Sequence, residues 1–448
     1  MTAKSLPRSE IISEIAHDLP FSGIATSSEE VCEGDLFLAL RGAHRDGSTF
    51  IREALARGAS FAVSETVSAA RTIRCRSAVG LLYALARARM KEVAPRVVAV
   101  TGSVGKSTYL AYARSLFEDK LRLHYPSGNY NTDVGVPMTI LAMPSSTELL
   151  LLEMGARRPG EIARLSLLAR PHVAVITRIG HSHLESFGDL AGVLRAKSEI
   201  LLGLRDQGTL ILNQDDPLLF KWSKGTDCRR IDVSLTDPRA DLLLKEDKDG
   251  KSLSLKFKDK ESTKIELEKR GEASELAAAL AAATALCLGF TQDEVAFKLS
   301  KCRAPAMRQE FIWHGGVLYI MDAYNASPES AAAALKLLQK ADVSGRRIAL
   351  LGDMQELGCD SEALHFSLGA LAFRAGVTDL YCIGSLARKI AEGAAAKGLA
   401  RERIRLFSID EKERLCAALK QDLTEGDALL LKASRALGLE SVLSILTK

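Results

Sequence analysis

The sequence lacks paired cysteines, a long apolar run and an excess of charge of one sign. Its eight cysteines stand singly, with no CxxC pair, which argues against a zinc ribbon or a disulfide framework and favours a reducing compartment. Lys and Arg number 60 against 56 Asp and Glu. This excess is small and dispersed, so nucleic acid is not expected as the main partner.

No segment of the sequence indicates export or a membrane span. The first twenty residues carry Lys, Glu, Asp and His where a signal peptide needs an apolar core. The most apolar window, 276–290, is Ala-rich and shorter than the roughly 20 residues that a bilayer span requires. We therefore expect a cytoplasmic protein in which 276–290 forms a buried helix.

Aromatic residues are scarce, and this decides how the cores are filled. They make up 5% of the chain, whereas 47% of its residues are hydrophobic, so Ala, Leu and Val must supply most of the core. A length of 448 residues fits about three domains at roughly 150 residues each. This length and composition argue against a small disulfide-stabilised protein and against a disordered chain.

The order of apolar segments predicts an α/β protein of three domains. In 1–94, short alternating segments surround a helical stretch, which indicates a small α/β domain. In 95–304, apolar runs at 96–100, 149–154 and 173–177 lead into loops that contain glycine, a pattern typical of a parallel sheet with a phosphate loop. A second strand and helix series predicts a Rossmann-like domain over 305–448.

One segment of the central region has a different texture. Residues 240–269 are charged, with alternating apolar positions. This alternation predicts an exposed antiparallel appendage.

A Gly-rich turn follows the strand at 96–100 and opens a helical segment at 108–119. A turn in this place can cradle phosphates, because the helix N-terminus presents free N–H groups. Lys106 supplies positive charge and the Ser107 hydroxyl is a candidate Mg²⁺ ligand. The spacing between the glycines is shorter than in the standard motif, so an ordinary strand–helix turn remains the alternative. The predicted phosphate contacts are Gly102, Ser103, Val104, Gly105, Lys106, Ser107 and Thr108.

Four further residues are candidates for chemistry near this loop. Glu153 ends a predicted strand, where its carboxylate faces the crevice and can hold Mg²⁺ beside Ser107; a solvated strand-end charge is the alternative. His181 and His183 follow the next strand and can bind metal. The plain loop interpretation is favoured for His181 and stays open for His183. Lys197 lies on a predicted helix, where a lone lysine is usually solvated.

Several strings in the sequence together resemble the Mur ligases. The resemblance covers essentially the whole chain, and GNYN and AYNASP point to the member that adds a D-Ala-D-Ala dipeptide. The strings are TGSVGKST, GNYNTDVGVP, LLEMGARRPGEIARLSLLARPHVAVIT, HLESFGDLAGVLRAKSEI, MDAYNASPES, LLGDMQELG and the N-terminal GDLFLALRGAHRDGSTF.

This resemblance implies a three-domain ligase of peptidoglycan precursor synthesis. Its N-terminal domain is expected to hold a UDP-sugar and its central domain ATP, while the C-terminal domain closes over both. The implied reaction is ATP-dependent formation of an amide between UDP-N-acetylmuramoyl-tripeptide and D-alanyl-D-alanine, through an acyl phosphate. ATP and two Mg²⁺ ions are the implied cofactors. A monomer is expected, because nothing in the sequence demands assembly.

The resemblance also implies roles for the candidate residues around the phosphate loop. Lys197 matches a lysine that becomes carbamylated and so acts as a carboxylate-like ligand for a second Mg²⁺. Glu153 is assigned to the first metal ion and His183 to the second. Lys106, Glu153, His183 and Lys197 then form the catalytic set, with Ser107 among the metal ligands. Asn129 and Asn131 are expected to position the reacting groups.

Further implied contacts come from the outer domains. Arg308 and Asp322 match residues that approach the nucleotide, and a plain interdomain turn is the alternative. An ordinary cluster at a helix start is the alternative for Lys432 and Arg435. The implied substrate-binding residues are Ser28, Asp46, Asn129, Asn131, Asn325, Lys432 and Arg435.

The sequence departs from the Mur ligase pattern at several positions. Val104 replaces a polar residue in the phosphate loop and Arg178 replaces an Asn. Ala273 and Ala277 stand where the family has His and Asn, which puts the nucleotide-base contacts in doubt, and Glu29 replaces an Arg. Two alternatives therefore stay open: another amino-acid ligase of the same family, and a catalytically silent nucleotide-binding paralogue.

Overall fold

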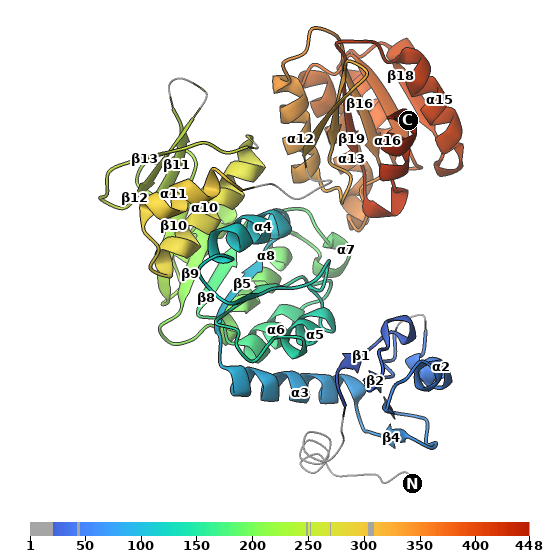
Figure 1. The fold of residues 1–448 in the computed structure, drawn as a ribbon. Coiled ribbons are helices and arrows are strands. Elements are labelled where there is room, and N and C mark those ends of the chain that lie inside the picture. Colours follow the sequence, from blue (N-terminus) through green and yellow to red (C-terminus); the bar gives the residue numbers. More distant parts are fainter. Residues whose placement is uncertain are drawn as a thin grey trace.

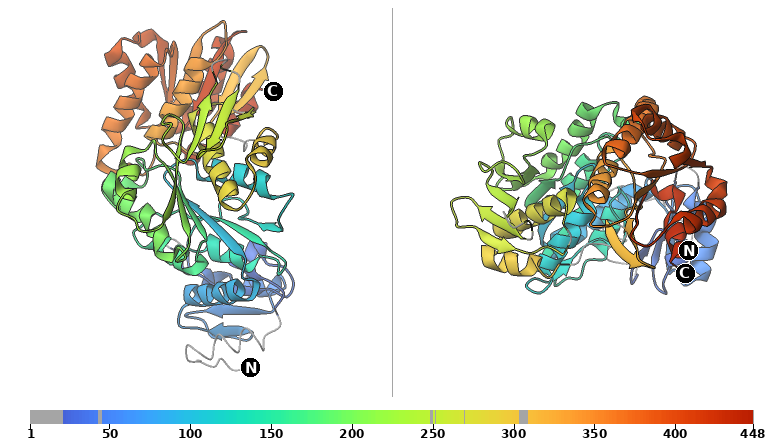
Figure 2. Two further views of the ribbon diagram at one scale, coloured as in Figure 1. Left: turned by 90° about the vertical axis from the view of Figure 1, so that its left-hand side faces the viewer. Right: turned by 90° about the horizontal axis from the view of Figure 1, so that it is seen from above.

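The computed structural model describes residues 21–42, 45–247, 250, 252–268, 270–302 and 309–447. These residues form an α/β protein with separate four-, nine- and six-stranded sheets. Figure 1 shows the three sheets, each with its own helices, and in Figure 2 the first and last sheets lie at opposite ends of an elongated molecule. In the described part of the chain, no helix is long and apolar enough to cross a membrane.

The first sheet is small and parallel, in the order β1-β2-β3-β4. Its strands are β1 (Ile24–Ala25), β2 (Leu36–Leu38), β3 (Phe61–Ser64) and β4 (Thr72–Arg74). The connecting helices are η1 (Ser28–Glu30), η2 (Gly47–Phe50), α2 (Ile51–Ala56) and α3 (Ala78–Val93). Leu81, Leu82 and Leu85 of α3 pack on the strands, while partly buried residues of α5 (Gly135–Leu141) complete this core. The first sheet is thereby attached to the central domain.

The central sheet has the order β13-β12-β11-β10-β9-β8-β5-β7-β6. Its strands are β5 (Arg96–Thr101), β6 (Leu123–His124), β7 (Leu149–Glu153), β8 (Val173–Ile176), β9 (Thr209–Asn213), β10 (Arg229–Ser234), β11 (Leu242–Glu246), β12 (Leu253–Phe257) and β13 (Thr263–Ile265). From β6 to β11 neighbouring strands pair in parallel. This pairing confirms the predicted parallel sheet. The strands β5, β7 and β8 are almost wholly buried, as expected for parallel strands with helices on both faces.

The helices of the central domain connect these strands. They are α4 (Lys106–Phe117), α5, α6 (Glu161–Ala169), α7 (Leu184–Phe187), α8 (Leu190–Ser198), η3 (Glu199–Gly203), α9 (Pro217–Ser223), α10 (Glu272–Cys287) and α11 (Gln292–Leu299). Helix α4 begins at Lys106, two residues before the predicted segment, so the lysine and serine of the Gly-rich turn belong to its first turn.

The predicted antiparallel appendage is only partly correct. Strands β11, β12 and β13 do pair antiparallel, but they continue the central sheet instead of standing free. Leu253, Leu255 and Ile265 are buried in the same core as α10. The alternating pattern marks a sheet with one solvated face, and the expected exposure is wrong for the other face because α10 and α11 cover it.

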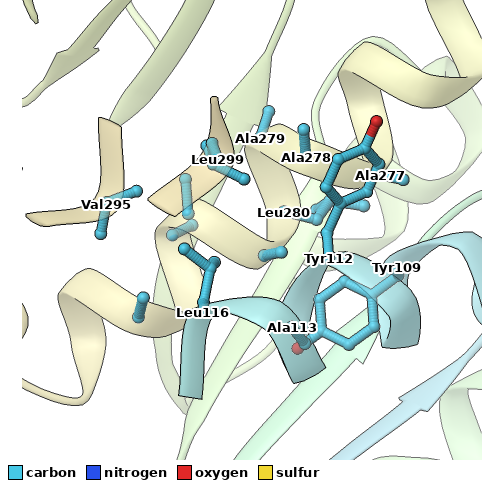
Figure 3. Close-up of a cluster of buried hydrophobic side chains, with 14 of the residues drawn as sticks. Tyr109, Tyr112, Ala113, Leu116, Ala277, Ala278, Ala279, Leu280, Val295 and Leu299 are labelled. Atoms are coloured by element: carbon cyan, nitrogen blue, oxygen red, sulfur yellow. The ribbon is translucent and has the colours of Figure 1, made fainter. Parts of the chain in front are cut away.

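Helix α10 is the buried helix expected at 276–290, and it fixes the position of α4. Its alanines permit close approach, and α4 and α10 share the buried cluster in Figure 3. The Tyr109 hydroxyl lies 2.8 Å from Thr284 Oγ1, and the Tyr112 hydroxyl 2.6 Å from Ser274 Oγ. These pairs satisfy both phenol groups inside the core. The first turns of α4, which follow directly on the Gly-rich turn, are therefore packed against α10.

The third sheet has the order β14-β15-β19-β16-β17-β18, and all neighbours are parallel except β14 and β15. Its strands are β14 (Glu310–His314), β15 (Val317–Met321), β16 (Arg347–Gly352), β17 (Asp379–Ile383), β18 (Ile404–Phe407) and β19 (Ala428–Lys432). Its helices are α12 (Pro328–Lys340), η4 (Gly358–Asp360), α13 (Ser361–Arg374), α14 (Ala387–Lys397), η5 (Arg401–Arg403), η6 (Ile409–Glu411), α15 (Lys412–Asp422), η7 (Arg435–Leu437) and α16 (Glu440–Leu446). The Rossmann-like pattern is confirmed.

Candidate active site

Three loops meet at one edge of the central sheet, where neighbouring strands β7, β5 and β8 end. Val100 lies opposite Glu153 and Thr101 opposite Ile176. The Gly-rich turn, the acidic strand end and the loop 177–183 are thus side by side. The carboxyl edge of a parallel sheet is where such folds bind ligands.

The Gly-rich turn has the backbone of a phosphate loop. Gly102 has φ +146°, and a Cβ at this position would lie 2.0 Å from Thr177 Oγ1, so only glycine fits. Gly105 has φ +88°, a left-handed conformation that leads directly into α4. Lys106 Nζ donates to the carbonyl of Gly102 at 2.7 Å. The turn therefore combines a helix N-terminus with a lysine ammonium group.

Glu153 is a buried carboxylate and not a solvated strand-end charge. It is 6% exposed. The Ser107 hydroxyl donates to its Oε2 at 2.7 Å, and Asn131 Nδ2 donates to its Oε1 at 2.8 Å. The structure thus brings together three predicted residues, from α4, from β7 and from the loop before α5, in an arrangement that is rich in oxygen atoms.

Lys197 is likewise buried, although a helical lysine is usually solvated. It is 1% exposed near the end of α8. Burial, with the charge of Lys106 as a smaller cause, lowers the pKa of Lys197 to about 7. Its ammonium lies 5.9 Å from the centre of the Phe187 ring, and the His183 ring centre lies 6.4 Å from the same point. Two predicted metal ligands therefore lie near the same aromatic ring.

The loop after β8 is tied to the phosphate loop by several hydrogen bonds. Thr177 Oγ1 donates to the carbonyl of Val104 at 2.6 Å. The backbone N–H of Ser103 donates to the Arg178 carbonyl at 2.8 Å, and the Gly180 N–H donates to Ser103 Oγ at 3.0 Å. Val104 therefore takes part through its backbone carbonyl, a contact that does not require a polar side chain at this position.

Both histidines of this loop contact the third domain. His181 Nδ1 lies 2.6 Å from Glu329 Oε1, and His183 Nδ1 lies 2.5 Å from Glu356 Oε2. The His183 contact contributes most to holding the pKa of Glu356 below its usual range. The sequence analysis did not single out either glutamate. Both lie in strings that carry the family resemblance, but pairs so far apart in the chain leave no local signal.

An ion-pair chain also links the two domains. Arg178 lies 2.8 Å from Glu272, and Glu272 lies 2.9 Å from Lys336 of α12. Despite partial burial, which raises it, the pKa of Glu272 falls to about 2 because Lys336 and Arg178 both bond its carboxylate. Arg178, the departure from the family's Asn, therefore has a partner of opposite charge.

Two of the predicted residues of the third domain, Asp322 and Asn325, contact Lys432. Lys432 is 2% exposed, and its Nζ lies 3.1 Å from Asp322 Oδ2 and donates to the Asn325 carbonyl at 2.5 Å. Arg435 lies over the Tyr324 ring and pairs with Glu440 at 3.2 Å. Arg308 is outside the described residues.

In the N-terminal domain, the structure places the two predicted residues on short helices. Ser28 is buried in η1. Asp46 caps η2, and its carboxylate accepts from the Ser48 N–H at 2.9 Å, which lowers the Asp46 pKa. The Tyr130 hydroxyl donates to Glu30 Oε2 at 3.4 Å and so links η1 to the loop that carries Asn131. Asn129 is exposed in that loop.

A cavity of about 1480 Å³ lies between the central and third domains. Its walls include Arg178, Arg270, Glu272, Phe311 and Trp313.

Ala277 is 2% exposed, and it belongs to the buried core that Figure 3 shows. Its side chain therefore packs against other core residues in place of a polar group.

The described side chains form no ready-made metal site of histidine, cysteine and carboxylate ligands. Within the described ranges, no three His, Cys, Asp or Glu side chains are grouped closely enough to hold a metal ion. The predicted ligand set instead uses a serine hydroxyl and a modified lysine. It stays a prediction.

The fold and the site define the class of protein. Family models match three consecutive parts of the chain: the Mur ligase family catalytic domain over 20–97, the Mur ligase middle domain over 100–286, and the glutamate ligase domain of Mur ligases over 307–435. With the full-length relatives below, these matches show that the chain belongs to the Mur ligase family.

Its relatives include one particular member of this family. The UDP-N-acetylmuramoyl-tripeptide–D-alanyl-D-alanine ligase of Bacillus subtilis is 34% identical over 94% of this chain and 92% of its own length. The Escherichia coli enzyme of the same name is 30% identical over 96% and 94%. A crystal structure of the Thermotoga maritima MurF ligase in complex with ADP matches with a TM-score of 0.84 and 31% identity, over 96% of this chain and 98% of that chain.

Proposed function

We propose that the protein joins D-alanyl-D-alanine to UDP-N-acetylmuramoyl-tripeptide at the expense of ATP, in peptidoglycan precursor synthesis. The observation that carries this proposal is full-length similarity, at 30–34% identity, to relatives with this named activity. The phosphate loop beside a buried carboxylate and a buried lysine supports it. We further propose that the reaction takes place in the cytoplasm and within one monomer.

The first step activates the tripeptide. Its terminal carboxylate attacks the γ-phosphate of ATP, which gives an acyl phosphate and ADP. Such a transfer depends mainly on positioning and on neutralisation of charge. Lys106 and the backbone N–H groups at the start of α4 are suited to both tasks, because the glycines leave the backbone open to phosphate oxygens.

The second step forms the amide. The amine of D-alanyl-D-alanine attacks the acyl carbon, and a tetrahedral intermediate forms that expels inorganic phosphate; the nitrogen loses a proton. We assign Asn131 to positioning near this centre because its amide already contacts Glu153. Asp322, Asn325, Lys432, Arg435 and Arg308 are proposed to bind nucleotide or dipeptide from the third domain, and Ser28, Asp46 and Asn129 to bind the UDP-linked substrate.

The residues at the phosphate loop fit a magnesium ion. Mg²⁺ prefers oxygen ligands and is commonly bound through one or two carboxylates together with phosphates. The Ser107 hydroxyl and the Glu153 carboxylate, 2.7 Å apart, are such a donor pair. When bound, Mg²⁺ neutralises charge on the phosphate oxygens. A second ion is proposed at His183 and carbamylated Lys197.

Burial prepares Lys197 for carbamylation. The neutral amine adds to the carbon of CO₂ and releases one proton, so that the side chain becomes an anionic carbamate. A pKa of about 7 keeps a large share of Lys197 neutral near neutral pH, whereas an ordinary lysine is almost fully charged. The chemistry that the resemblance implies therefore matches the environment of the side chain.

The direct test is ATP-dependent phosphate release in the presence of UDP-N-acetylmuramoyl-tripeptide, with and without D-alanyl-D-alanine, followed by mass analysis of the product. The proposal predicts a product heavier by the dipeptide less one water. Faster turnover with a free amino acid favours another amino-acid ligase of the family. ATP binding without turnover on either acceptor favours a silent paralogue.

A further inference from the structure

The loop 178–183 lies between two domains, and Glu329 of the third domain contacts it through two hydrogen-bonding groups of His181. Glu329 belongs to the first turn of α12, which begins at Pro328, directly after the Ser327 cap. Its Oε1 accepts from the His181 backbone N–H at 2.8 Å and lies 2.6 Å from His181 Nδ1. One carboxylate oxygen of the third domain thus contacts both backbone and side chain of a central-domain residue.

Gly180 makes room for this carboxylate. A Cβ at Gly180 would lie 2.6 Å from Glu329 Cδ and under 3 Å from both carboxylate oxygens. Gly180 is not among the residues with positive φ, so alanine is compatible with its backbone. Space for Glu329, and not backbone conformation, is therefore the reason for glycine here.

The same short loop continues into the phosphate loop. Gly180 donates its N–H to Ser103 Oγ at 3.0 Å, and the Ser182 hydroxyl donates to the same oxygen at 2.8 Å. The residue that Glu329 contacts, His181, is thus the direct neighbour of Gly180, whose N–H bonds the phosphate loop. A shift of the His181 peptide moves Gly180 and, with it, the hydrogen-bond partners of Ser103.

We propose that Glu329 is a positioning residue that couples the docking of the third domain to the geometry of the phosphate loop, through His181, Gly180 and Ser103. When the third domain is docked, Glu329 contacts the Gly180–His181 backbone, and this contact fixes the position of Ser103 for nucleotide binding. The effect on catalysis rests on the proposed function, whereas the effect on nucleotide binding does not.

The test uses the full chain with Glu329→Ala, Glu329→Gln and Gly180→Ala. We measure ADP affinity by calorimetry, the radius of gyration of the ADP complex by small-angle scattering, and phosphate release. Glu329→Ala is expected to weaken ADP binding and lower phosphate release by roughly tenfold, the order expected for a lost hydrogen bond to a charged group, and to enlarge the radius of gyration. Glu329→Gln keeps an acceptor oxygen and is expected to restore ADP affinity to within about threefold.

Gly180→Ala displaces Glu329 without changing it, so it should match Glu329→Ala. In the double variant the truncated side chain leaves room for the new methyl group, and no further loss is expected. The control is Glu362→Ala. Glu362 also lies in the first turn of a third-domain helix, but it pairs with Lys389 of its own domain and is 68% exposed; all three readouts should stay at the wild-type value.

Three outcomes overturn the proposal. The first is unchanged ADP affinity in Glu329→Ala, including the case in which the molecule expands, because docking is then not coupled to the phosphate loop. The second is an equal loss from Gly180→Ala in the presence and absence of Glu329. The third is the same loss in Glu362→Ala. If the wild type shows no ligase turnover, the proposed function fails, while ADP affinity and scattering still decide the role of Glu329.

Discussion

Replacement of Lys197 by methionine should raise the free energy of unfolding, and this gain should decrease as the pH rises. Burial lowers the pKa of this lysine from 10.5 to about 7. Between these values the unfolded chain binds a proton that the folded chain does not, so the wild type gains stability with increasing pH. Methionine has a similar volume and no charge, and so removes both the penalty and its pH dependence.

The magnitude follows from linkage. The advantage of Lys197→Met in the free energy of unfolding should shrink by about 1.4 kcal/mol for each pH unit between about 7 and 10.5. From pH 7.5 to 9.0 the expected change is therefore about 2 kcal/mol. Carbonate-free buffer is required, since carbamylation replaces the amine.

Hydrogen exchange of α8 peptides in increasing urea measures this difference for the central domain, without assuming that the whole chain unfolds in one step. Lys197→Arg is not a suitable control, because it buries a permanent charge. Lys221→Met, on the partly exposed α9, controls for the loss of a lysine. A stability difference between wild type and Lys197→Met that stays constant from pH 7.5 to 9.0 refutes the lowered pKa of Lys197.

Three further changes test other parts of the account. Lys197→Ala should abolish ligase turnover with an unchanged circular dichroism spectrum, and short carboxylic acids should restore part of the activity; full activity in this variant contradicts the metal role. Glu153→Gln keeps the size of the side chain but removes its charge, so turnover should fall at least about tenfold and the Mg²⁺ concentration for half-maximal rate should rise. Tyr112→Phe removes a hydroxyl that bonds Ser274 in the core and should destabilise the central domain by about 1 kcal/mol in urea unfolding; no loss there argues against that hydrogen bond.

The parallel sheets and the phosphate loop were predictable because their signals are local. Buried parallel strands are continuous apolar runs, and glycine marks the turn between strand and helix, as at Gly102 and Gly105. The carboxyl ends of parallel strands lie at one edge of the sheet, and this rule placed Glu153 beside Ser107. For these elements the sequence contains the physical cause directly.

Features that depend on distant packing were not predictable in this way. Nothing local distinguishes buried Lys197 from a solvated helical lysine, because its burial comes from residues on other helices. The alternation in β12 gave the pairing correctly, but the cover of Leu253 and Leu255 by α10 depends on a helix later in the chain. The contact between His181 and Glu329 spans 148 residues and exists only once two domains are docked.

Amide ligation driven by ATP is the activity proposed for the phosphate loop, Glu153 and Lys197. The direct test of this activity is phosphate release with UDP-N-acetylmuramoyl-tripeptide, with and without D-alanyl-D-alanine, together with mass analysis of the product. Phosphate release should require both substrates, and the product should be heavier by the dipeptide less one water. A protein that binds ATP but gives no such product, with either the dipeptide or a free amino acid, contradicts the proposed activity.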